Sequence, residues 1–374
     1  INDSPVATGG PETVPIVEED VTTYETSKID SSTYELLKDD YDDTADNQSL
    51  ATSGNVTGND DETVFSYIAV VGSTDYYTEQ GTWQIKSGSN EEWFDIPASG
   101  ISDSAALVFK VKNTEDNTND SHIRFLPAQD FHGTPGTIQV RLGDNSDDTI
   151  TESTSASDTK ALDDIGGLDG TGTWSVDTVT IQTDGEIVGV NDAPTISGSD
   201  PVTMEVDEDK DDAENAGDTV NNLFGDIFSD ETDDQTGTTG GLDSSAALTG
   251  IVITEYTPDP TTGEWQYKTT SGTWTTLPSG LSDSAGFAVA AADSLRFAPA
   301  ADFNGEPPEL TVRLVEDSSG ELVTGEGSDG RLDVSVNGDD SRYTADTATL
   351  KITVNPVNDA PVISGSAADP TMTE

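Results

Sequence analysis

The strongest constraint on the fold of this chain is an internal repeat. Val190-Asn-Asp-Ala-Pro194 reappears as Val357-Asn-Asp-Ala-Pro361, and the chain opens on the variant Ile1-Asn-Asp-Ser-Pro5. The Asn residues stand at positions 2, 191 and 358, so the periods are 189 and 167 residues. Long periods of this kind indicate tandem copies of one structural unit. We therefore expect modules at 1–190 and 191–357, followed by a linker and the start of a third module at 358–374.

The interiors of the two copies match in the same order. Gly81-Thr-Trp-Gln84 corresponds to Gly263-Glu-Trp-Gln266, and Asp130-Phe-His-Gly133 corresponds to Asp302-Phe-Asn-Gly305. Further pairs are Trp93 with Trp274, Ile101-Ser-Asp-Ser-Ala105 with Leu281-Ser-Asp-Ser-Ala285, and Ile123-Arg-Phe-Leu-Pro127 with Leu295-Arg-Phe-Ala-Pro299. We attribute the extra length of the first copy to insertions near 113–120 and within 144–170. We expect the segments 144–170 and 232–241 to be mobile loops.

The matched segments alternate apolar and polar residues, as half-buried strands do. Ile138, Val140 and Leu142 alternate with polar neighbours, and the run Leu310-Thr-Val-Arg-Leu314 repeats the pattern. Residues 348–354 alternate in the same way, and Gly, Pro, Asn and Asp separate the runs. The segments 34–37 and 223–228 predict at most a helical turn each. The chain is thus expected to be all-β, built of tandem immunoglobulin/cadherin-like antiparallel β-sandwich modules with loop insertions.

Charge restricts the partners of the chain. Fifteen Lys and Arg stand against 73 Asp and Glu, which gives a net charge of −58. Nucleic acid and anionic membrane surfaces would be repelled, and no apolar run is long enough to insert into a bilayer. The acids are open to two interpretations, cation binding or a solvated and self-repelling surface. The absence of Cys favours an extracellular module stabilised by metal in place of disulfides.

Acidic residues recur at equivalent places in both copies. A triplet follows the linker Asn by about 17 residues, a spacing that we expect to bring it back to the linker: Glu18, Glu19 and Asp20, then Asp207, Glu208 and Asp209. A second group comprises Asp39, Asp40, Asp42 and Asp43, then Asp230, Glu231, Asp233 and Asp234. A third follows the Arg-Leu strand, at Asp144 and at Glu316-Asp317. Calcium accepts six to eight oxygens in flexible geometry, so such groups suit Ca²⁺; acids that simply end strands are the alternative.

The combination of Val-Asn-Asp-Ala-Pro boundaries with Gly-x-Trp-Gln, Arg-Phe-x-Pro and Asp-Phe-x-Gly resembles the cadherin-like (VCBS-type) repeats of giant bacterial RTX adhesins. The resemblance covers nearly the whole chain. It implies a bacterial cell-surface protein exported by type I secretion, with a role in cell adhesion and biofilm formation. It also implies Ca²⁺ at the junctions, where the central junction would use Asp144, Asn191, Asp192, Glu208 and one or more of Asp230 and Asp233. With the repeat-equivalent acids, the expected metal ligands are Glu19, Asp42, Asp144, Asn191, Asp192, Glu208, Asp209, Asp230, Asp233, Asp317 and Asp359.

The expected partners are neighbouring modules of the same chain. The alternative is a glycan or protein on a cell surface, recognised by the loops inserted in the first copy. Trp83, Trp93, Trp265 and Trp274 recur in pairs, and repeat-equivalent Trp in a sandwich indicates core residues, with sugar stacking as the alternative.

Recurring Arg residues and the scarcity of His complete the sequence signals. Arg124, Arg141, Arg296 and Arg313 are expected to pair with recurring acids such as Asp130 and Asp302. Only His122 and His132 are present, both in the first copy, and no nucleophile, phosphate-binding or zinc motif occurs. We therefore expect no enzymatic activity.

Overall fold

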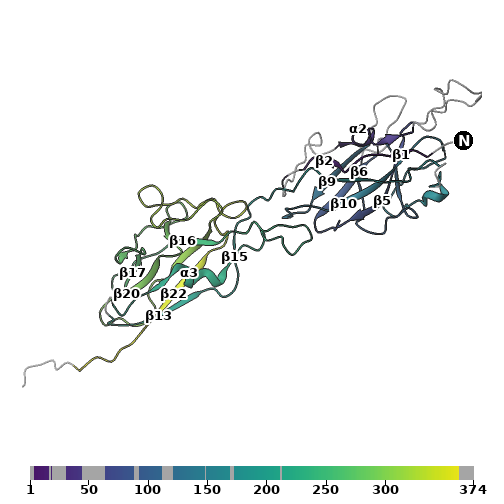
Figure 1. Cartoon of the computed structure of the whole chain (residues 1–374). Coiled ribbons are helices and arrows are strands. Elements are labelled where there is room, and N and C mark those ends of the chain that lie inside the picture. The colour runs from purple at the N-terminus through teal and green to yellow at the C-terminus, as the bar shows by residue number, and fades with distance from the viewer. Residues whose placement is uncertain are drawn as a thin grey trace, which may run out of the picture. The chain divides into compact units, whose positions relative to one another are not determined.

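A computed structural model describes residues 4–16, 18, 31–43, 64–87, 92–111, 121–147, 149–168, 172–210 and 213–361. The chain forms two compact units (Figure 1). Unit 1 comprises residues 1–190 together with 231–245, and unit 2 comprises 191–230 and 246–374. Both units are all-β, as the alternating patterns predict.

Unit 1 is a sandwich of two sheets. One sheet has the order β2-β11-β10-β5-β8, from β2 (Glu12–Val14), β11 (Val179–Thr183), β10 (Thr137–Gly143), β5 (Tyr67–Thr74) and β8 (Leu107–Lys110). The other has the order β3-β9-β6-β7, from β3 (Ser31–Ser32), β9 (His122–Pro127), β6 (Gly81–Lys86) and β7 (Phe94–Asp95). β1 (Val6–Ala7) pairs with β4 (Tyr41–Asp42).

Unit 2 repeats this plan. Its first sheet has the order β13-β22-β21-β16-β19, from β13 (Val202–Asp207), β22 (Ala348–Asn355), β21 (Leu310–Glu316), β16 (Leu248–Glu255) and β19 (Phe287–Ala290). Its second has the order β14-β20-β17-β18, from β14 (Asp218–Thr219), β20 (Ser294–Pro299), β17 (Gly263–Lys268) and β18 (Thr275–Thr276), and β12 (Thr195–Ile196) pairs with β15 (Phe228–Ser229). Pairing is antiparallel except at one edge, where β2 runs parallel to β11 and β13 parallel to β22.

Helical structure is confined to short pieces. α2 (Thr33–Leu37) is capped by Ser32 and α3 (Val220–Phe224) by Thr219, and each N-cap hydroxyl accepts a hydrogen bond from the backbone N–H of the third helical residue. Single 3₁₀ turns follow at Leu162–Asp164 and Gly225–Ile227. This confirms the expectation of single helical turns in these two regions. Among the described residues no helix is long and apolar enough to cross a membrane.

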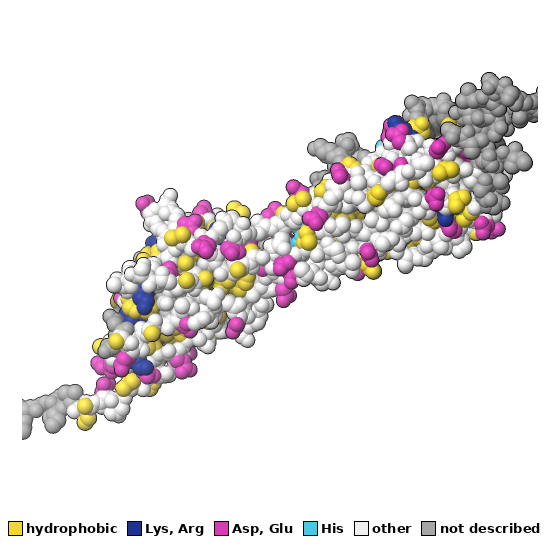
Figure 2. All heavy atoms as spheres, in the orientation of Figure 1, with side chains coloured by type: hydrophobic (Ala, Val, Ile, Leu, Met, Phe, Trp, Pro, Cys, Tyr) yellow, Lys and Arg dark blue, Asp and Glu magenta, His cyan; other side chains and the backbone are white. Residues whose placement is uncertain are grey.

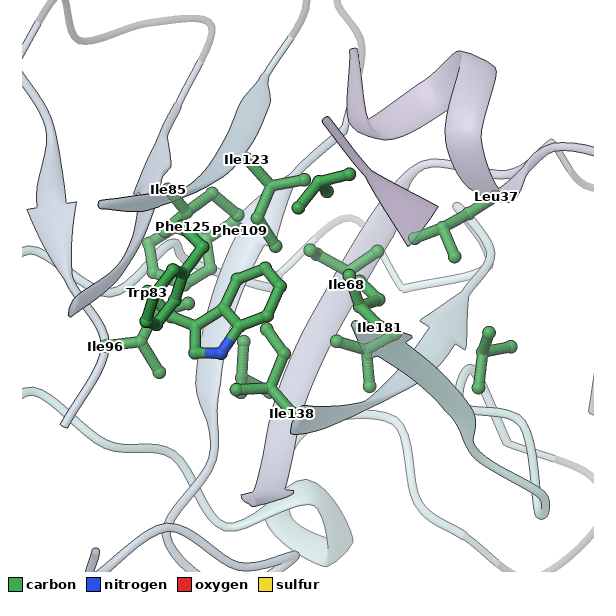
Figure 3. Close-up of a cluster of buried hydrophobic side chains, with 14 of the residues drawn as sticks. Leu37, Ile68, Trp83, Ile85, Ile96, Phe109, Ile123, Phe125, Ile138 and Ile181 are labelled. Atoms are coloured by element: carbon green, nitrogen blue, oxygen red, sulfur yellow. The ribbon is translucent and has the colours of Figure 1, made fainter. Parts of the chain in front are cut away.

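Trp83 occupies the centre of the unit 1 core, between the two sheets (Figure 3). Its side chain is fully buried, packs edge-on against Phe125 at 5.3 Å between ring centroids, and donates its indole N–H to the carbonyl of Gly136 at 2.9 Å. Trp265 makes the equivalent contacts in unit 2, with Phe297 at 5.6 Å and the carbonyl of Pro308 at 2.8 Å. The expectation of core Trp residues is confirmed at these two positions.

Trp93 and Trp274 differ from that expectation, because both are only partly buried. The guanidinium carbon of Arg124 lies 3.9 Å from the centroid of Trp93, and that of Arg296 lies 4.2 Å from the centroid of Trp274. Each half-buried ring therefore stacks on a buried guanidinium group and is not a core residue.

A third layer covers the second face of each five-stranded sheet. In unit 1, Ile150, Leu162 and Trp174 from the segment 144–178 bury themselves against Ala69 and Val108. In unit 2, Leu322 and Val334 from the segment 317–347 do the same against Val252 and Ala288. The prediction of an insertion within 144–170 is therefore wrong, because the second copy has a segment of similar length in the same place. The prediction of a mobile loop there is also wrong, since its apolar residues form a second core. Residues 113–120, the other predicted insertion, lie outside the described residues.

We expect Trp83→Ala to destabilise unit 1 by about 3–5 kcal/mol, the usual cost of removing a buried aromatic ring. Trp93→Ala is the matched control, with an expected loss of about 1 kcal/mol for a cation–π contact at the surface. Hydrogen exchange of β5 and β10 measures the opening of unit 1, with β16 and β21 as an internal reference. Equal losses for the two variants would contradict the assignment of Trp83 to the core.

Candidate cation sites at the two ends of unit 2

Acidic side chains gather at both ends of the unit 2 sandwich. β21 and β22 are antiparallel, with Val312 opposite Ala348, so the end of β21 and the end of β22 lie at opposite ends of the sheet. We name the first cluster, Asn191, Asp230 and Glu316, the Glu316 centre. We name the second, Asp209, Asp302 and Asp359, the Asp302 centre.

The Glu316 centre joins a linker residue to the end of a central strand. Glu316 ends β21 and is fully buried. Its Oε1 accepts hydrogen bonds from Asn191 Nδ2 at 2.6 Å and from Ser318 Oγ at 2.8 Å, while its Oε2 is buried and accepts none. Asp230, which follows β15, is buried nearby and accepts a hydrogen bond from the backbone N–H of Ala246. Strand pairing therefore fixes two carboxylates and one amide side chain in one place.

Burial raises the pKa of the Glu316 carboxyl above its ordinary value, and the negative charge of Asp230 raises this pKa further. Hydrogen bonds from Ser318 and Asn191 act in the opposite direction. No ion pair within the described part of the chain includes Glu316. The ionised carboxylate is therefore poorly compensated by the protein alone.

The Glu316 centre fits a hard divalent cation. A buried carboxylate oxygen without a hydrogen-bond donor, a second carboxylate beside it and an amide side chain form an all-oxygen donor set, which suits Ca²⁺. A cation there would neutralise charge that is otherwise costly to bury. Asp192 is the next residue of the linker and is partly buried.

The Asp302 centre lies at the other end of unit 2. One carboxylate oxygen from each of Asp209, Asp302 and Asp359 lies within 4.8 Å of the others, and all three residues are exposed. Asp209 follows β13 and Asp302 follows β20, and both adopt the left-handed conformation, with φ of 60° and 59°. The charge of Asp209, followed by that of Asp302, raises the pKa of Asp359. The arrangement places two carboxylates of unit 2 beside the carboxylate of a linker residue, a donor set that suits a divalent cation.

The structure separates the residues that the resemblance brings together at the central junction. Glu208 is buried at the end of unit 2 that carries the Asp302 centre, where its carboxylate accepts hydrogen bonds from the N–H of Val357 at 2.7 Å and from Asn304 Nδ2 at 3.1 Å. It therefore lies at the opposite end of unit 2 from Asn191 and Asp230. The acidic triplet meets the following linker, because β13 carries it along the full length of the sheet.

Asp144 is the unit 1 equivalent of Glu316. It follows β10, is fully buried, and accepts hydrogen bonds from the backbone N–H and the hydroxyl of Ser146. Asp144 N–H donates to the carbonyl of Thr173, and the neighbouring Gly172 is bonded to Ser4. Asp144 thus lies at the end of unit 1 where the described chain enters.

The remaining predicted ligands have separate places. Asp42 lies in β4 opposite Val6, and Asp317 is exposed and accepts a hydrogen bond from Ala247 N–H at 2.8 Å. Asp233 is buried in the part of unit 1 formed by residues 231–245. Glu19 lies outside the described residues.

Sequence reasoning missed Asp302 as a candidate ligand, having assigned it and Asp130 to Arg partners. The expectation that recurring Arg residues pair with recurring Asp residues is confirmed for Arg141 and Arg313, although their partners are the repeat-equivalent Asp103 and Asp283 rather than Asp130 or Asp302. Arg141 and Arg313 each bind one carboxylate with two nitrogens, at 2.6 and 2.9 Å to Asp103 and at 3.0 Å twice to Asp283. Arg124 and Arg296 donate to Gln84 and Gln266, both at 2.8 Å. The conserved spacing of Asp-Phe-x-Gly in the two copies was the available signal for Asp302.

No protein-family model and no curated protein sequence matches the chain. Among solved structures, the crystal structure of the group B streptococcus pilus 2b backbone protein aligns over 79% of this chain and 84% of that chain at 10% identity. The TM-score of 0.12 is too low for this alignment to support any argument.

Acidic side chains are spread over the visible surface, with few Lys and Arg among them (Figure 2).

We expect Glu316→Gln to stabilise the chain at pH 7 in the presence of a chelator, by about 1–3 kcal/mol. A neutral amide accepts the same hydrogen bonds and donates toward Asp230. Because the folded-state pKa of Glu316 is raised, the wild-type chain loses stability as pH rises through that pKa, and the advantage of the variant disappears below the ordinary pKa of Glu. Urea unfolding at pH 4 and pH 7 measures the difference. Glu321→Gln, an exposed acid in unit 2, is the control; an equal gain for both variants would contradict the burial argument.

Proposed function

We propose that this chain is a pair of structural modules from an extracellular bacterial adhesin, and that Ca²⁺ bound at the module ends stiffens the linkers. The observation that carries the proposal is the hydrogen bond of linker residue Asn191 to the buried carboxylate of Glu316. A linker side chain and an unneutralised strand-end carboxylate share one site, so a cation there would bind linker and module together.

The Asp302 centre supports the same role at the other end of unit 2. Asp359 belongs to the linker Val357-Asn-Asp-Ala-Pro361, whereas Asp209 and Asp302 belong to the body of unit 2. Glu208 already holds this linker through the N–H of Val357. Asp209, Asp302 and Asp359 would hold a Ca²⁺ ion there, and its positive charge would offset the repulsion between the three carboxylates. Each linker that flanks unit 2 would then be held to the unit at a cation centre.

The fold supports a non-catalytic role. Apolar side chains fill the space between the two sheets of each unit, and His132 Nε2 lies 3.1 Å from the Ser244 hydroxyl. Recognition of a cell-surface glycan or protein is the alternative. The loops of the first copy give this alternative less support than the sequence suggests, because the segment 144–178 covers a sheet face and has an equivalent in the second copy. Adhesion and biofilm formation, the role that the resemblance implies, remain the proposed biological context.

The test is calcium binding measured by titration calorimetry on three chains. The wild-type chain is expected to bind Ca²⁺ and to gain stability by about 2.7 kcal/mol at a hundredfold excess over Kd. Glu316→Gln is expected to lose one binding event, and the combined variant Asp209→Asn, Asp302→Asn, Asp359→Asn a different one.

Glu321→Gln and Glu326→Gln are the matched controls and should leave the stoichiometry unchanged. Small-angle scattering with and without Ca²⁺ reports on linker stiffness through the maximum dimension. A chain that binds no Ca²⁺, or whose binding is untouched by both sets of substitutions, would refute the proposal.

A further inference from the structure

Residues 231–245 form a strap that belongs to unit 1, although they lie in the chain between β15 and β16. The strap meets unit 1 along the segment that contains Gly133. Thr134 N–H donates to Gly240 O at 2.8 Å, and Leu242 N–H donates to His132 O at 3.2 Å. Gln80 Nε2 donates to Thr239 O at 2.6 Å, and the Ser244 hydroxyl lies 3.1 Å from His132 Nε2. The prediction of a mobile loop at 232–241 is therefore wrong.

This contact requires close approach of two backbones. A Cβ on Gly133 would lie 2.2 Å from Gly240 O, and a Cβ on Gly240 would lie 2.1 Å from Thr134 O. Both glycines also have positive φ, at 129° and 79°. Only glycine permits this geometry, so the strap and its acceptor are matched in backbone shape.

Unit 2 carries the same acceptor in an open state. Gly305 is the equivalent of Gly133, with a φ of 126° against 129°, and it pairs with Val354 as Gly133 pairs with Ile187. His132 and Gly133 are buried, whereas Asn304 and Gly305 are exposed. Among the described atoms, the nearest to a Cβ on Gly305 is Phe303 Cζ of the same unit, at 4.0 Å.

The hydrogen-bonding groups of this acceptor are also available. Glu306 N–H and Asn304 O correspond to Thr134 N–H and His132 O, and neither makes a backbone hydrogen bond within the described part of the chain. Asn304 and Thr262 stand at the repeat positions of His132 and Gln80, and their side chains are bonded within unit 2, to Glu208 at 3.1 Å and to the carbonyl of Asp259 at 2.9 Å, so the backbone groups carry the comparison. A strand edge with a preformed donor, a preformed acceptor and a glycine between them is a site for backbone addition.

We propose that the Asn304–Glu306 edge of unit 2 is a docking site for a strap of the 231–245 type, presented by another copy of this module. The occupant follows from unit 1, where the equivalent edge holds such a strap through two backbone hydrogen bonds. This inference rests on the strap contact and does not depend on bound Ca²⁺.

The experiment extends the full chain by a further copy of the second module, as residues 1–357 followed directly by 191–374. The join keeps the linker sequence, because Val190 and Val357 precede the same Asn-Asp-Ala-Pro phrase. The added copy presents its own strap at high effective concentration. The Glu306 amide of the first unit 2 is then expected to exchange at least tenfold more slowly than in the original chain, as measured by NMR-detected hydrogen exchange.

The control changes only the added strap, with Gly240→Ala and Gly241→Ala in the extra copy. In the original chain a Cβ on Gly240 would lie 2.1 Å from the carbonyl oxygen of Thr134, and a Cβ on Gly241 would lie 2.1 Å from that of Gln235. The altered strap should therefore fail to protect the Glu306 amide, while the amides of both original units keep their protection from exchange. The measurement is made with Ca²⁺ and with a chelator, which separates this outcome from the cation sites. Unchanged exchange of the Glu306 amide on extension, or protection that survives the two substitutions, would overturn the proposal.

Discussion

The acidic end of unit 2 is organised around one buried carboxylate at the end of a central strand. Glu316 ends β21, which is paired on one side with β16 and on the other with β22, so its carboxylate cannot move out to solvent without disrupting the sheet. Two donors satisfy one of its oxygens, and the charge of Asp230 opposes ionisation. Burial of such a charge costs several kcal/mol unless a proton or a cation compensates it. The linker residue Asn191 is held beside this carboxylate, because its amide group supplies one of the two hydrogen-bond donors.

The scaffold that holds these carboxylates is stiff because both faces of the central sheet are covered. Arg313 crosses from the sheet to the covering segment, binding Asp283 with two nitrogens and the carbonyls of Thr344 and Ala345 with the third. Arg141 makes the corresponding contacts in unit 1. Side chains fixed in this way preorganise a binding site before a ligand arrives. The segments 144–178 and 317–347 pack on these sheets through their apolar residues.

The sequence predicts the repeat, the all-β class and the buried Trp83 and Trp265, because period-two patterns and recurring aromatics report directly on burial. It does not predict which acids meet. The spacing of about 17 residues was taken to return Glu208 to Asn191, but β13 is six residues long and spans roughly 20 Å at about 3.3 Å per residue. The triplet therefore reaches the far end of the sandwich. The sequence also does not predict that Asp302 lies close to Asp359. That proximity depends on the left-handed backbone of Asp302 and joins two segments that are distant in sequence.

The two copies of the Asp-Phe-x-Gly segment have the same backbone conformation, whether or not a strap lies against them. Gly133 is covered and Gly305 is open, yet their φ angles differ by only a few degrees, and each keeps its backbone bridge, to Ile187 and to Val354. An edge that needs no rearrangement loses little conformational entropy on docking. The strap, however, carries Glu231, Asp233, Asp234 and Asp243, and Asp302 stands three residues before Gly305. Bringing such a strap to unit 2 adds negative charge beside the Asp302 centre, so a cation bound there lowers the electrostatic cost of docking. If both proposals hold, cation binding and strap docking would favour each other at this end of the module through separate contacts.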